Sequence, residues 1–589
     1  MRSRRTHGLL TIQRFVVIGV LLAVGRAVDG AEFAESLRRP VALALSSDEK
    51  LLYVANRRSG TFSVVDTEVR STIAELSLGK HFSDLKAVGR DRLLALDEET
   101  HELLLLQAAG REIVVKSRTA VSPYPVTLAV TTDGKHCVVA SLWSRRLTFI
   151  DLPEDDEGEM QVVGSIDMPF APRTQLLVKE DKKLIVADSH GGQLAIVDVQ
   201  KRQLLHVREF PGHNIRGMST NADGTMLVVA HQMLNELAHT VRNDVHWGLL
   251  MSNDLRWLKL DAVLTPGTDL YDGAHMHPLG HAGSATGDPA GLIMTSQGAV
   301  LVTLGGVREI AIGREDDFSL NRVFVGRRPT AIVADSQGEF AYVANTFDDS
   351  VSVIDIDGRE SIADISLGPQ SELTLVDRGE LLFFNANLSH DSWMSCHSCH
   401  TDGHTNGLLN DNFSDASFGA PKRVLSLLGR HGTAPFAWTA SAESLEVQIR
   451  KSIVGTMQAD EPPTEEQITA LAAYIEALQP PPAIDTARGT KDLKGVARGE
   501  KLFGSLDCTR CHAPPVFTTP KTYDVGLDDK LGGKRFNPPT LRGVGQRGPY
   551  FHDNRAATLE EVFLKYEHQL DRKLTAEELR DLLSFLRSL

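Results

Sequence analysis

A short sequence unit recurs between residues 39 and 370. Residues 53–56 are Tyr-Val-Ala-Asn, and a polar turn separates them from Ser-Val-Val-Asp at 63–66. Near the other end of this region, residues 342–345 are again Tyr-Val-Ala-Asn, and residues 350–355 are Ser-Val-Ser-Val-Ile-Asp. Each apolar run has the length of a strand and is bounded by turn-forming residues. The repeat therefore predicts many short and similar β-strands.

The spacing of the unit predicts a β-propeller. The small residue that ends each copy of the first strand serves as a marker, and successive markers are 40, 45, 47, 43, 73 and 41 residues apart. The seven markers are Ala55, Ala95, Ala140, Ala187, Ala230, Thr303 and Ala344. This period is typical of four-stranded propeller blades. We predict an all-β, seven-bladed propeller over residues 32–370. Asn385-Ala386-Asn387 could mark an eighth blade, but we assign it to the region that follows.

The one long step contains an insertion, residues 231–289, which is rich in histidine. Its histidines are His231, His239, His246, His275, His277 and His281. One interpretation is a loop that caps a propeller face, with the imidazoles hydrogen-bonded to backbone. The other is a second metal site or a substrate-binding loop. Only His275-Met276-His277 has the close spacing that metal ligands often show.

Two CxxCH motifs follow the repeats. Their cysteines and histidines are Cys396, Cys399, His400, Cys508, Cys511 and His512. This spacing is that of covalent haem c attachment, in which two thiols bond to the porphyrin edge and the histidine binds the iron. One copy alone would also fit a thiol redox pair or half of a zinc site, but two copies that both end in His favour haem. We predict two covalently bound haem c groups, with His400 and His512 as proximal iron ligands.

The region after residue 370 is duplicated. An Arg-Gly-Glu triplet precedes each CxxCH motif, at 378–380 and at 498–500. Each half ends in an apolar helical pattern that begins with a Thr-x-x-Gln/Glu capping box, at Thr464 and at Thr575. We therefore predict two mostly α-helical, cytochrome-c-like domains. Their predicted bounds are 371–482 and 483–589.

The N-terminus predicts an exported protein. Residues 1–31 contain Arg2, Arg4 and Arg5, then an apolar stretch, then mostly small residues. This is the pattern of a cleaved signal peptide, and it is too short to span a bilayer. Haem c is attached outside the cytoplasm in bacteria, so a periplasmic or otherwise exported location is expected, with no integral membrane segment in the mature chain. The net charge of −15 disfavours nucleic acid and anionic membranes as partners.

These motifs resemble two known families. The Tyr-Val-Ala-Asn repeats are similar to the YVTN family of β-propellers. The paired Arg-Gly-Glu and CxxCH units resemble the di-haem cytochrome c peroxidases and their MauG-like relatives over residues 371–589. The segment Pro549-Tyr550-Phe551-His552-Asp553, which runs into Thr558-Leu559-Glu560-Glu561-Val562, adds to this likeness. The resemblance implies an oxidoreductase in which electrons pass between two haems.

The same resemblance implies roles for two residues, Trp438 and Tyr566. A family tryptophan lies between the haems and assists electron transfer, and Trp438 occupies the matching place. The alternative is a core aromatic residue. A residue shortly after the Thr-Leu-Glu-Glu-Val segment closes the C-terminal haem, as Met in the peroxidases and as Tyr in the MauG-like proteins. Tyr566 matches that position and is a candidate axial ligand; His568 is a rival, and both could instead lie on the surface.

The first haem region departs from the family pattern. His404 and His431 follow the first CxxCH motif, neither at the distance of the family's dissociable histidine. Thr456 stands where a carboxylate normally precedes a distal Met, and Met457 is a further candidate iron ligand. Peroxide cleavage needs a group that shuttles a proton. The candidate substitutes for the missing carboxylate are His431, Glu443 and Glu446.

The resemblance also implies a calcium site between the haems, although its ligands are incomplete. Asn537 and Pro539 fit one side, whereas Gly419 stands where an Asn is common. Calcium is therefore an alternative that the sequence leaves open.

Three functions remain open from the sequence. The first is a peroxidase- or MauG-like oxidoreductase with a small redox protein, a cytochrome or cupredoxin, as its electron donor or acceptor. The second is an electron carrier in which both irons are six-coordinate. The third is a propeller that binds a protein partner or a ligand while the haems sense redox state, because a fold does not fix a function.

Overall fold

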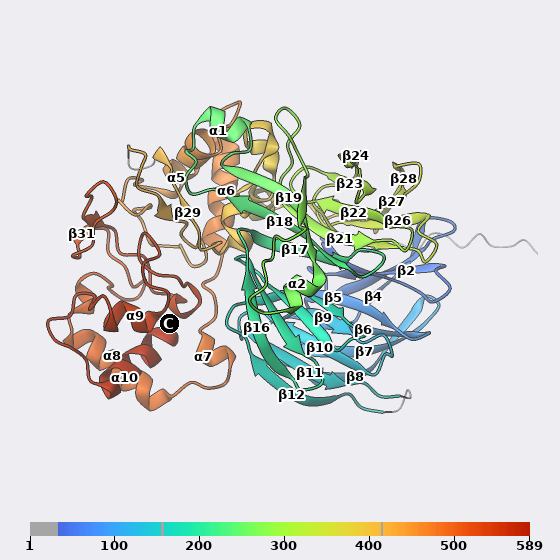
Figure 1. Cartoon of the computed structure of the whole chain (residues 1–589), viewed down its shortest axis with the longest axis horizontal. Helices are drawn as coiled ribbons and strands as arrows, with labels where there is room; N and C mark the ends of the chain where they lie inside the picture. Colours follow the sequence, from blue (N-terminus) through green and yellow to red (C-terminus); the bar gives the residue numbers. More distant parts are fainter. Residues whose placement is uncertain (1–32, 155–157, 318, 414–415) are drawn as a thin grey trace, which may run out of the picture. The chain divides into compact units, whose positions relative to one another are not determined.

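The computed structural model describes residues 33–154, 158–317, 319–413 and 416–589 (Figure 1). The predicted signal peptide at 1–31 lies outside these ranges. Within them, no helix combines the length and the apolar character that a membrane crossing requires.

The N-terminal region forms seven four-stranded antiparallel sheets, coloured blue to yellow-green in Figure 1. The first four contain β1 (Pro40–Leu45), β2 (Leu51–Asn56), β3 (Thr61–Asp66), β4 (Ser71–Ser77), β5 (Phe82–Val88), β6 (Arg92–Asp97), β7 (Glu102–Ala109), β8 (Glu112–Ala120), β9 (Pro125–Val130), β10 (His136–Ser141), β11 (Arg146–Asp151), β12 (Gln161–Asp167), β13 (Pro172–Val178), β14 (Lys183–Asp188), β15 (Gln193–Asp198) and β16 (Gln203–Glu209). The last three contain β17 (His213–Thr220), β18 (Met226–Leu234), β19 (Met251–Lys259), β20 (His275–Pro278), β21 (Pro289–Met294), β22 (Ala299–Leu304), β23 (Glu309–Arg314), β24 (Asn321–Phe324), β25 (Pro329–Ala334), β26 (Phe340–Asn345), β27 (Ser350–Asp355) and β28 (Glu360–Ser366).

The seven sheets close into a ring, which confirms the predicted propeller. The first strand of each sheet contacts the first strand of the next, and β25 contacts β1. All seven marker residues lie on the second strand of a blade and are fully buried. Asn385-Ala386-Asn387 does not form an eighth blade, because it leads into the 3-10 helix η1 (Ala386–Leu388).

Buried hydrogen bonds explain why the repeat ends in Asn and resumes with Ser. The Asn56 amide nitrogen donates to the hydroxyl of Ser63, at 2.9 Å, on the neighbouring strand. Asn345 donates to Ser352 in the same way, at 2.8 Å. Both asparagines are fully buried, so each amide needs a partner inside the blade. The repeated motif therefore gives the buried amide nitrogen of each Asn a hydroxyl acceptor on the neighbouring strand.

The histidine-rich segment 231–289 is part of the fifth blade and not an insertion separate from it. It contains β19 and β20, the third and fourth strands of that blade. The extra length comes from nine-residue strands and from two loops that carry α1 (Arg242–His246) and α2 (Leu260–Leu264). His275, which we considered as a metal ligand with His277, stacks on Trp257 with ring centroids 5.4 Å apart.

Short helices dominate the C-terminal region, coloured orange to red at its end in Figure 1. The helical elements of the first half are α3 (Leu375–Phe383), η1, η2 (His390–Ser392), α4 (Cys396–Cys399), η3 (Thr401–Gly403), α5 (Leu445–Lys451), η5 (Ser452–Thr456) and α6 (Glu465–Ala477). Those of the second half are α7 (Ile484–Ala487), α8 (Leu493–Ser505), η6 (Cys508–Arg510), η7 (Val544–Gln546), α9 (Leu559–Leu564) and α10 (Ala576–Arg587). Two small hairpins pair β29 (Leu409–Asn410) with β30 (Lys422–Arg423) and β31 (Tyr523–Asp524) with β32 (Arg535–Phe536).

The two halves pack in the same way. Helix α3 contacts α6, and α8 contacts α10. The glycine of each Arg-Gly-Glu triplet lies at the crossing, where a Cβ atom on Gly379 or on Gly499 would come within 2.0 Å of a backbone carbonyl oxygen. Thr464 and Thr575 form the predicted capping boxes at the starts of α6 and α10. The duplication in sequence is therefore a duplication of the helix pair that supports each CxxCH motif.

Candidate functional site

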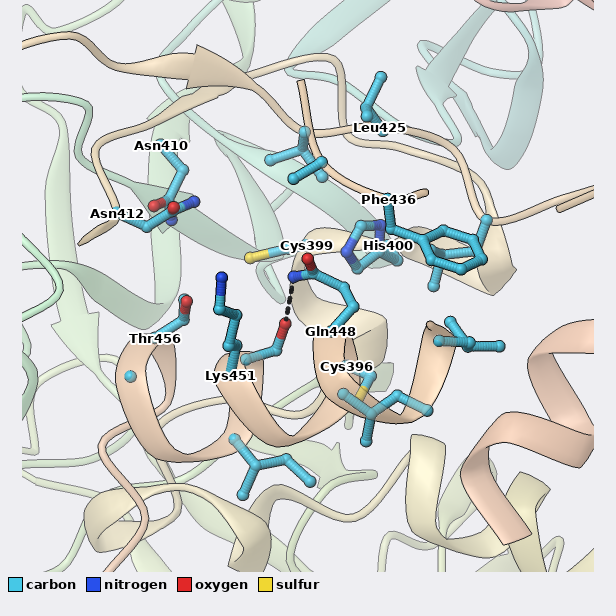
Figure 2. A pocket seen from close by; sticks show the side chains of 18 of the residues that line it. Cys396, Cys399, His400, Asn410, Asn412, Leu425, Phe436, Gln448, Lys451 and Thr456 are labelled. Atoms are coloured by element: carbon cyan, nitrogen blue, oxygen red, sulfur yellow. Dashed lines mark hydrogen bonds between the residues drawn. The ribbon is translucent and has the colours of Figure 1, made fainter. Parts of the chain in front are cut away.

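The first CxxCH motif opens onto a cavity of about 590 Å³. Cys396 and Cys399 lie on α4, and His400 follows that helix directly. The walls include Gln448 of α5 and Met457, which directly follows η5. In Figure 2 the Gln448 side chain points into the cavity that Cys399 and His400 also line.

The second CxxCH motif opens onto a separate cavity of about 640 Å³. Its cysteines and histidine lie on and after η6, and the side chain of His568 lines the same cavity. Each half of the duplicated region therefore has its own cavity, lined by the two thiols and the imidazole of its CxxCH motif, which is the arrangement that covalent haem attachment needs.

The two motif histidines are neutral at physiological pH. Burial lowers the pKa of His400 and of His512 to about 4. The Nδ1 of His512 lies 3.2 Å from the carbonyl oxygen of Phe517, so Nδ1 carries the proton and Nε2 keeps its lone pair. A neutral imidazole held by a second hydrogen bond is the form that binds a metal.

The thiols do not have the properties of a catalytic redox pair. Burial raises the pKa of Cys396 and of Cys399 to about 12, and that of Cys508 to about 11. Reactive cysteines of redox motifs have a lowered thiol pKa. These values favour attachment over the thiol redox alternative.

One wall is shared by both cavities. Trp438 is buried and lines both of them. Its indole N–H donates to the carbonyl oxygen of Arg423, at 2.8 Å, and its own carbonyl oxygen accepts from the backbone N–H of Asn537, at 2.7 Å. The side chains of Arg423 and Asn537 line both cavities too. Trp438 is thus a fixed partition between the two sites.

Buried arginines lie at this wall and beside it: Arg423 and Arg430 line both cavities, and Arg547 lines the second. Burial lowers the pKa of Arg423 and of Arg430 to about 10, and that of Arg547 falls well below its ordinary value through burial and through repulsion by the other two. Their hydrogen bonds go to backbone carbonyls, such as that from Arg430 Nε to the Ser426 oxygen, at 2.7 Å. In the described part of the chain, none of the three forms an ion pair with a carboxylate. Buried charges are normally paired, and the propionate groups of haem would supply the missing charge, so the cavities fit haem.

The two candidate axial ligands of the second site lie differently. The hydroxyl of Tyr566 donates to the carbonyl oxygen of Arg555, at 2.5 Å, and its side chain is not among those that line the cavity. The Nδ1 of His568 is buried and has no hydrogen-bond partner among the described residues. Burial, and then the proximity of His512, lower the pKa of His568 to about 4. The geometry therefore places His568, and not the Tyr566 hydroxyl, in the cavity of His512.

The candidates for the first site are also divided. Met457 is buried and lines the cavity, and so does Thr456. His431 is exposed and lies outside the residues that line either cavity, and the same holds for the two candidate carboxylates, Glu443 and Glu446. Among the described residues that line this cavity, none is Asp or Glu.

His404 faces the propeller and not the first cavity. Its imidazole lies 3.0 Å from the hydroxyl of Ser426 and 3.1 Å from the carbonyl oxygen of Gln546. It also packs edge-on against the rings of Trp143 and His190, which belong to the propeller. Both ring nitrogens of His404 have hydrogen-bond partners, so this histidine contributes to packing and does not offer a free ligand atom to an iron.

Gln448 is a candidate that the sequence did not single out. Its amide nitrogen donates to the hydroxyl of Ser452, at 3.1 Å, while its carbonyl oxygen is buried with no hydrogen-bond partner among the described residues. An unpaired buried acceptor in a cavity can accept a hydrogen bond from a ligand. Its position one turn after the start of α5 was the only signal, and many helix glutamines have no such role.

The residues proposed for calcium are engaged in other contacts. Asn537 donates through its amide nitrogen to the carbonyl oxygens of Thr519 and Lys521, at 3.0 and 3.1 Å. Pro539 lines both cavities, whereas the backbone N–H of Gly419 donates to Asp411. Calcium therefore stays a prediction.

The propeller holds the first CxxCH segment through buried polar groups. Asp288 accepts from the hydroxyls of Ser395 and Ser398, at 2.5 and 2.6 Å. His213 donates from Nε2 to the carbonyl oxygen of Ser398, at 2.8 Å. All four of these residues are buried. The propeller thus positions the first CxxCH segment, to which the first haem would be attached.

Two propeller arginines extend this contact to the residues after the motif. Arg173 and Arg216 both donate to one carboxylate oxygen of Asp402, at 3.0 and 2.8 Å. Burial alone would raise the pKa of Asp402, but the two guanidinium groups hold it well below its ordinary value. The carboxylate is therefore charged and paired.

Comparison with known proteins relates the C-terminal region to a known family. Residues 374–482 match the family model described as di-haem cytochrome c peroxidase. The match confirms the predicted resemblance and includes the first CxxCH motif, Trp438 and Gln448.

Individual proteins with similar sequences include members named as MauG and as a cytochrome c peroxidase. The chain is 27% identical to the methylamine utilization protein MauG of Methylorubrum extorquens, over 36% of this chain and 76% of that protein. It is 27% identical to the cytochrome c551 peroxidase of Nitrosomonas europaea, over 39% of this chain and 84% of that protein. The hydrazine synthase subunit gamma of Kuenenia stuttgartiensis is 26% identical, over 36% and 77%. The first two of these relatives support a peroxidase-like oxidoreductase.

A solved structure was also found to be similar. The hydrazine synthase of Kuenenia stuttgartiensis superposes with a TM-score of 0.48 and 18% identity, covering 56% of this chain and 99% of that chain.

Proposed function

We propose that this protein is an exported di-haem c-type cytochrome that acts as a peroxidase- or MauG-like oxidoreductase. The observation that carries this proposal is the wall of Trp438 and Arg423, which both CxxCH cavities share. A peroxidase-like domain with two sites needs a route for electrons between them, and an aromatic side chain fixed at the partition provides one.

The chain's own residues would hold the two haem groups. Each CxxCH pair would attach one porphyrin, and His400 and His512 would bind the irons. The buried arginines at the shared wall would pair with the propionates. When bound, the haems would supply one-electron redox chemistry. The protein would position them, exclude water and set which site is open to a substrate.

The first cavity would be the open site. Gln448 offers an unpaired carbonyl oxygen there, which would accept a hydrogen bond from the O–H of a peroxide-like substrate and hold it in place. A carboxamide cannot shuttle a proton as a carboxylate does. We therefore expect either that peroxide is cleaved slowly at this site or that the oxidant that reacts there is a compound other than free peroxide.

The second cavity would be the closed site. His568 would be a second iron ligand in this cavity, because it lines the cavity of His512 and its Nδ1 is buried with no hydrogen-bond partner among the described residues. A haem with two strong protein ligands exchanges electrons and does not bind substrate. This site would therefore serve the electron partner.

Redox-poised EPR with quantified haem tests the proposal. Two haems per chain are expected, one with high-spin character in a resting or half-reduced state and one low-spin throughout. Hydrogen peroxide should then oxidise a reduced small cytochrome in the presence of the protein. A preparation with two low-spin haems in every state, and no peroxide-dependent turnover, would exclude the peroxidase-like function.

The second candidate function is a pure electron carrier. The absence of Asp and Glu from the described lining of the first cavity favours it, and Met457 could then close that site as a ligand. The same EPR experiment separates the two candidates. A low-spin first haem that becomes high-spin in Met457→Ala would support the carrier.

The partner and the location are part of the proposal. The signal-like N-terminus supports export to the periplasm. The net charge of −15 would attract a basic redox protein, such as a small cytochrome or cupredoxin. The propeller would act mainly as a platform, since its buried groups already hold the first CxxCH loop. Electron transfer with a basic partner should weaken as ionic strength rises.

A further inference from the structure

Three metal-binding side chains converge where the fifth propeller blade meets the first haem domain. His246 ends helix α1, in the loop between β18 and β19, whereas His390 and Asp391 lie on η2, shortly before Cys396. The Nδ1 of His246 lies 3.0 Å from the Nε2 of His390 and 2.9 Å from the Oδ2 of Asp391. The third pair, His390 Nε2 and Asp391 Oδ2, is 3.5 Å apart. Within the described ranges, this is the one group of at least three such residues close enough to hold a metal ion.

The three separations match the edges of a coordination polyhedron. Zinc binds imidazole nitrogen and carboxylate oxygen at about 2.0–2.1 Å in tetrahedral geometry, so neighbouring donor atoms lie about 3.3 Å apart. The observed triangle of 2.9, 3.0 and 3.5 Å has this size. One ion could therefore contact all three donors with little movement.

Hydrogen bonds leave this triangle with more acceptors than donors when each ring carries one proton. The Nδ1 of His390 lies 2.9 Å from the carboxylate of Asp460, so a singly protonated His390 donates there and its Nε2 is an acceptor. The facing Asp391 oxygen is also an acceptor. The Nδ1–H of His246 is then the single proton available for three contacts. A cation in the centre would satisfy all three donor atoms together.

Asp460 accepts a hydrogen bond from the ring nitrogen of His390 that does not face the cluster. A metal-bound histidine normally donates its other ring N–H to a carboxylate or carbonyl, which fixes the ring and strengthens the ligand. His390 is nearly buried, with 9% of its side chain exposed, whereas that of His246 is 36% exposed. The cluster is therefore buried on the side of His390 and exposed to solvent on the side of His246. An ion could enter from the exposed side, and a water molecule could bind it there.

We propose that His246, His390 and Asp391 form a binding site for a divalent transition metal, with zinc as the ion that fits best. Two imidazoles and one carboxylate are the donor set of such ions. The metal would fasten the β18–β19 loop to the segment that leads into the first CxxCH motif. This inference stands on its own residues and does not rest on the proposed oxidoreductase function.

Metal analysis of the purified holoprotein tests the site. Inductively coupled plasma mass spectrometry should find about one zinc, or one other divalent first-row metal in addition to haem iron, for every two haem irons. The His246→Ala variant should retain both haems and lose this metal to background. The matched control is His275→Ala, since His275 stacks on Trp257 in the same blade, and it should keep the metal.

Two further measurements keep the test decisive. Zinc K-edge absorption of the wild-type protein should show nitrogen and oxygen ligands at about 2.0 Å, including two imidazoles. In the Asp460→Asn variant, competition with a chelator should show zinc affinity lowered about 10–100-fold, the usual cost of losing a supporting carboxylate. Wild-type protein without bound metal that also fails to take up added Zn²⁺, or binding that is unchanged in His246→Ala, would overturn the proposal.

Discussion

Trp438 donates its indole N–H to the backbone carbonyl of Arg423, and the side chains of both residues line both CxxCH cavities. The hydrogen bond fixes the ring at the partition between two sites that lie 112 residues apart in sequence at their histidines, His400 and His512. A core aromatic residue would not need to face two cavities. The relationship therefore gives the predicted bridging role a structural basis that mutation can test.

Replacing Trp438 with Phe should slow electron transfer between the haem sites while both haems stay attached. Phenylalanine fills most of the space but lacks the N–H and is harder to oxidise than indole. We expect a rate at least about tenfold lower, equivalent to about 1.4 kcal/mol in the barrier. This rate is measured by stopped-flow spectroscopy, in which one haem is reduced and the absorbance of the other haem is followed over time. Trp143→Phe, at the propeller contact, is the control and should leave the rate unchanged, whereas an unaltered rate in Trp438→Phe would argue against the bridge.

The second haem should respond to His568 and not to Tyr566. In His568→Ala, the low-spin EPR signal of the haem at Cys508 and Cys511 should be replaced by a high-spin one. Tyr566→Phe removes only a hydroxyl that donates to Arg555, so its spectrum should match that of the wild type. The opposite pattern, a spectral change in Tyr566→Phe alone, would restore the tyrosine ligand that the family resemblance implied.

A carboxylate at position 448 should raise peroxide-dependent turnover. Gln448→Glu would place a proton-shuttling group where the described lining of the first cavity has none, and general acid–base catalysis contributes about 10²- to 10⁴-fold. We expect at least about a tenfold gain in kcat/KM for hydrogen peroxide. Glu443→Gln and Glu446→Gln are controls, because both side chains are exposed, and they should change turnover less than about twofold. No gain in Gln448→Glu would remove this residue from the proposed site.

The glycine of the second Arg-Gly-Glu triplet should be essential for packing. A Cβ atom on Gly499 would come within 2.0 Å of the Asp581 carbonyl oxygen, so Gly499→Ala must separate α8 from α10. Overpacking of this kind costs about 1–3 kcal/mol or more in the free energy of unfolding. Gly504→Ala, later in the same helix, meets no atom within 4 Å and should stabilise slightly or be neutral. Urea unfolding followed by circular dichroism compares the two variants.

The parts of the fold that follow from local chemistry could be predicted from the sequence. The Asn and Ser of each clear repeat mark a strand end because their side chains must pair inside the blade, as Asn56 and Ser63 do. The capping box at Thr575 marks a helix start for a similar local reason. The fifth blade was harder to predict from the sequence, because its longer strands and two loops make the spacing between its marker and the next one longer than in the other blades.

From residue patterns alone, the site could be predicted only at the CxxCH motifs, whose residues are contiguous in the sequence, and Trp438 was found through the family resemblance. Tyr566 and His568 are two residues apart, and sequence spacing cannot show which side chain turns into the cavity. Gln448 carries no signal until α5 is placed against the CxxCH segment. Asp288 is more than a hundred residues from the serines that it holds, so its role depends on how the propeller packs against the haem domain.

The contact between the propeller and the first CxxCH loop should weaken in mild acid through His213. Burial lowers the pKa of this imidazole from 6.5 to about 4, so the unfolded chain binds a proton in this range and the folded protein does not. Stability should therefore be complete above pH 6.5 and fall as the pH drops towards 4, by about 3 kcal/mol from this group. His213→Gln keeps a donor for the Ser398 carbonyl but cannot titrate. The difference in unfolding free energy between pH 7 and pH 4.5, measured with urea, should be smaller in this variant than in the wild type by roughly 2–3 kcal/mol. An equal pH dependence in both proteins would show that His213 is not buried as a neutral ring at this contact.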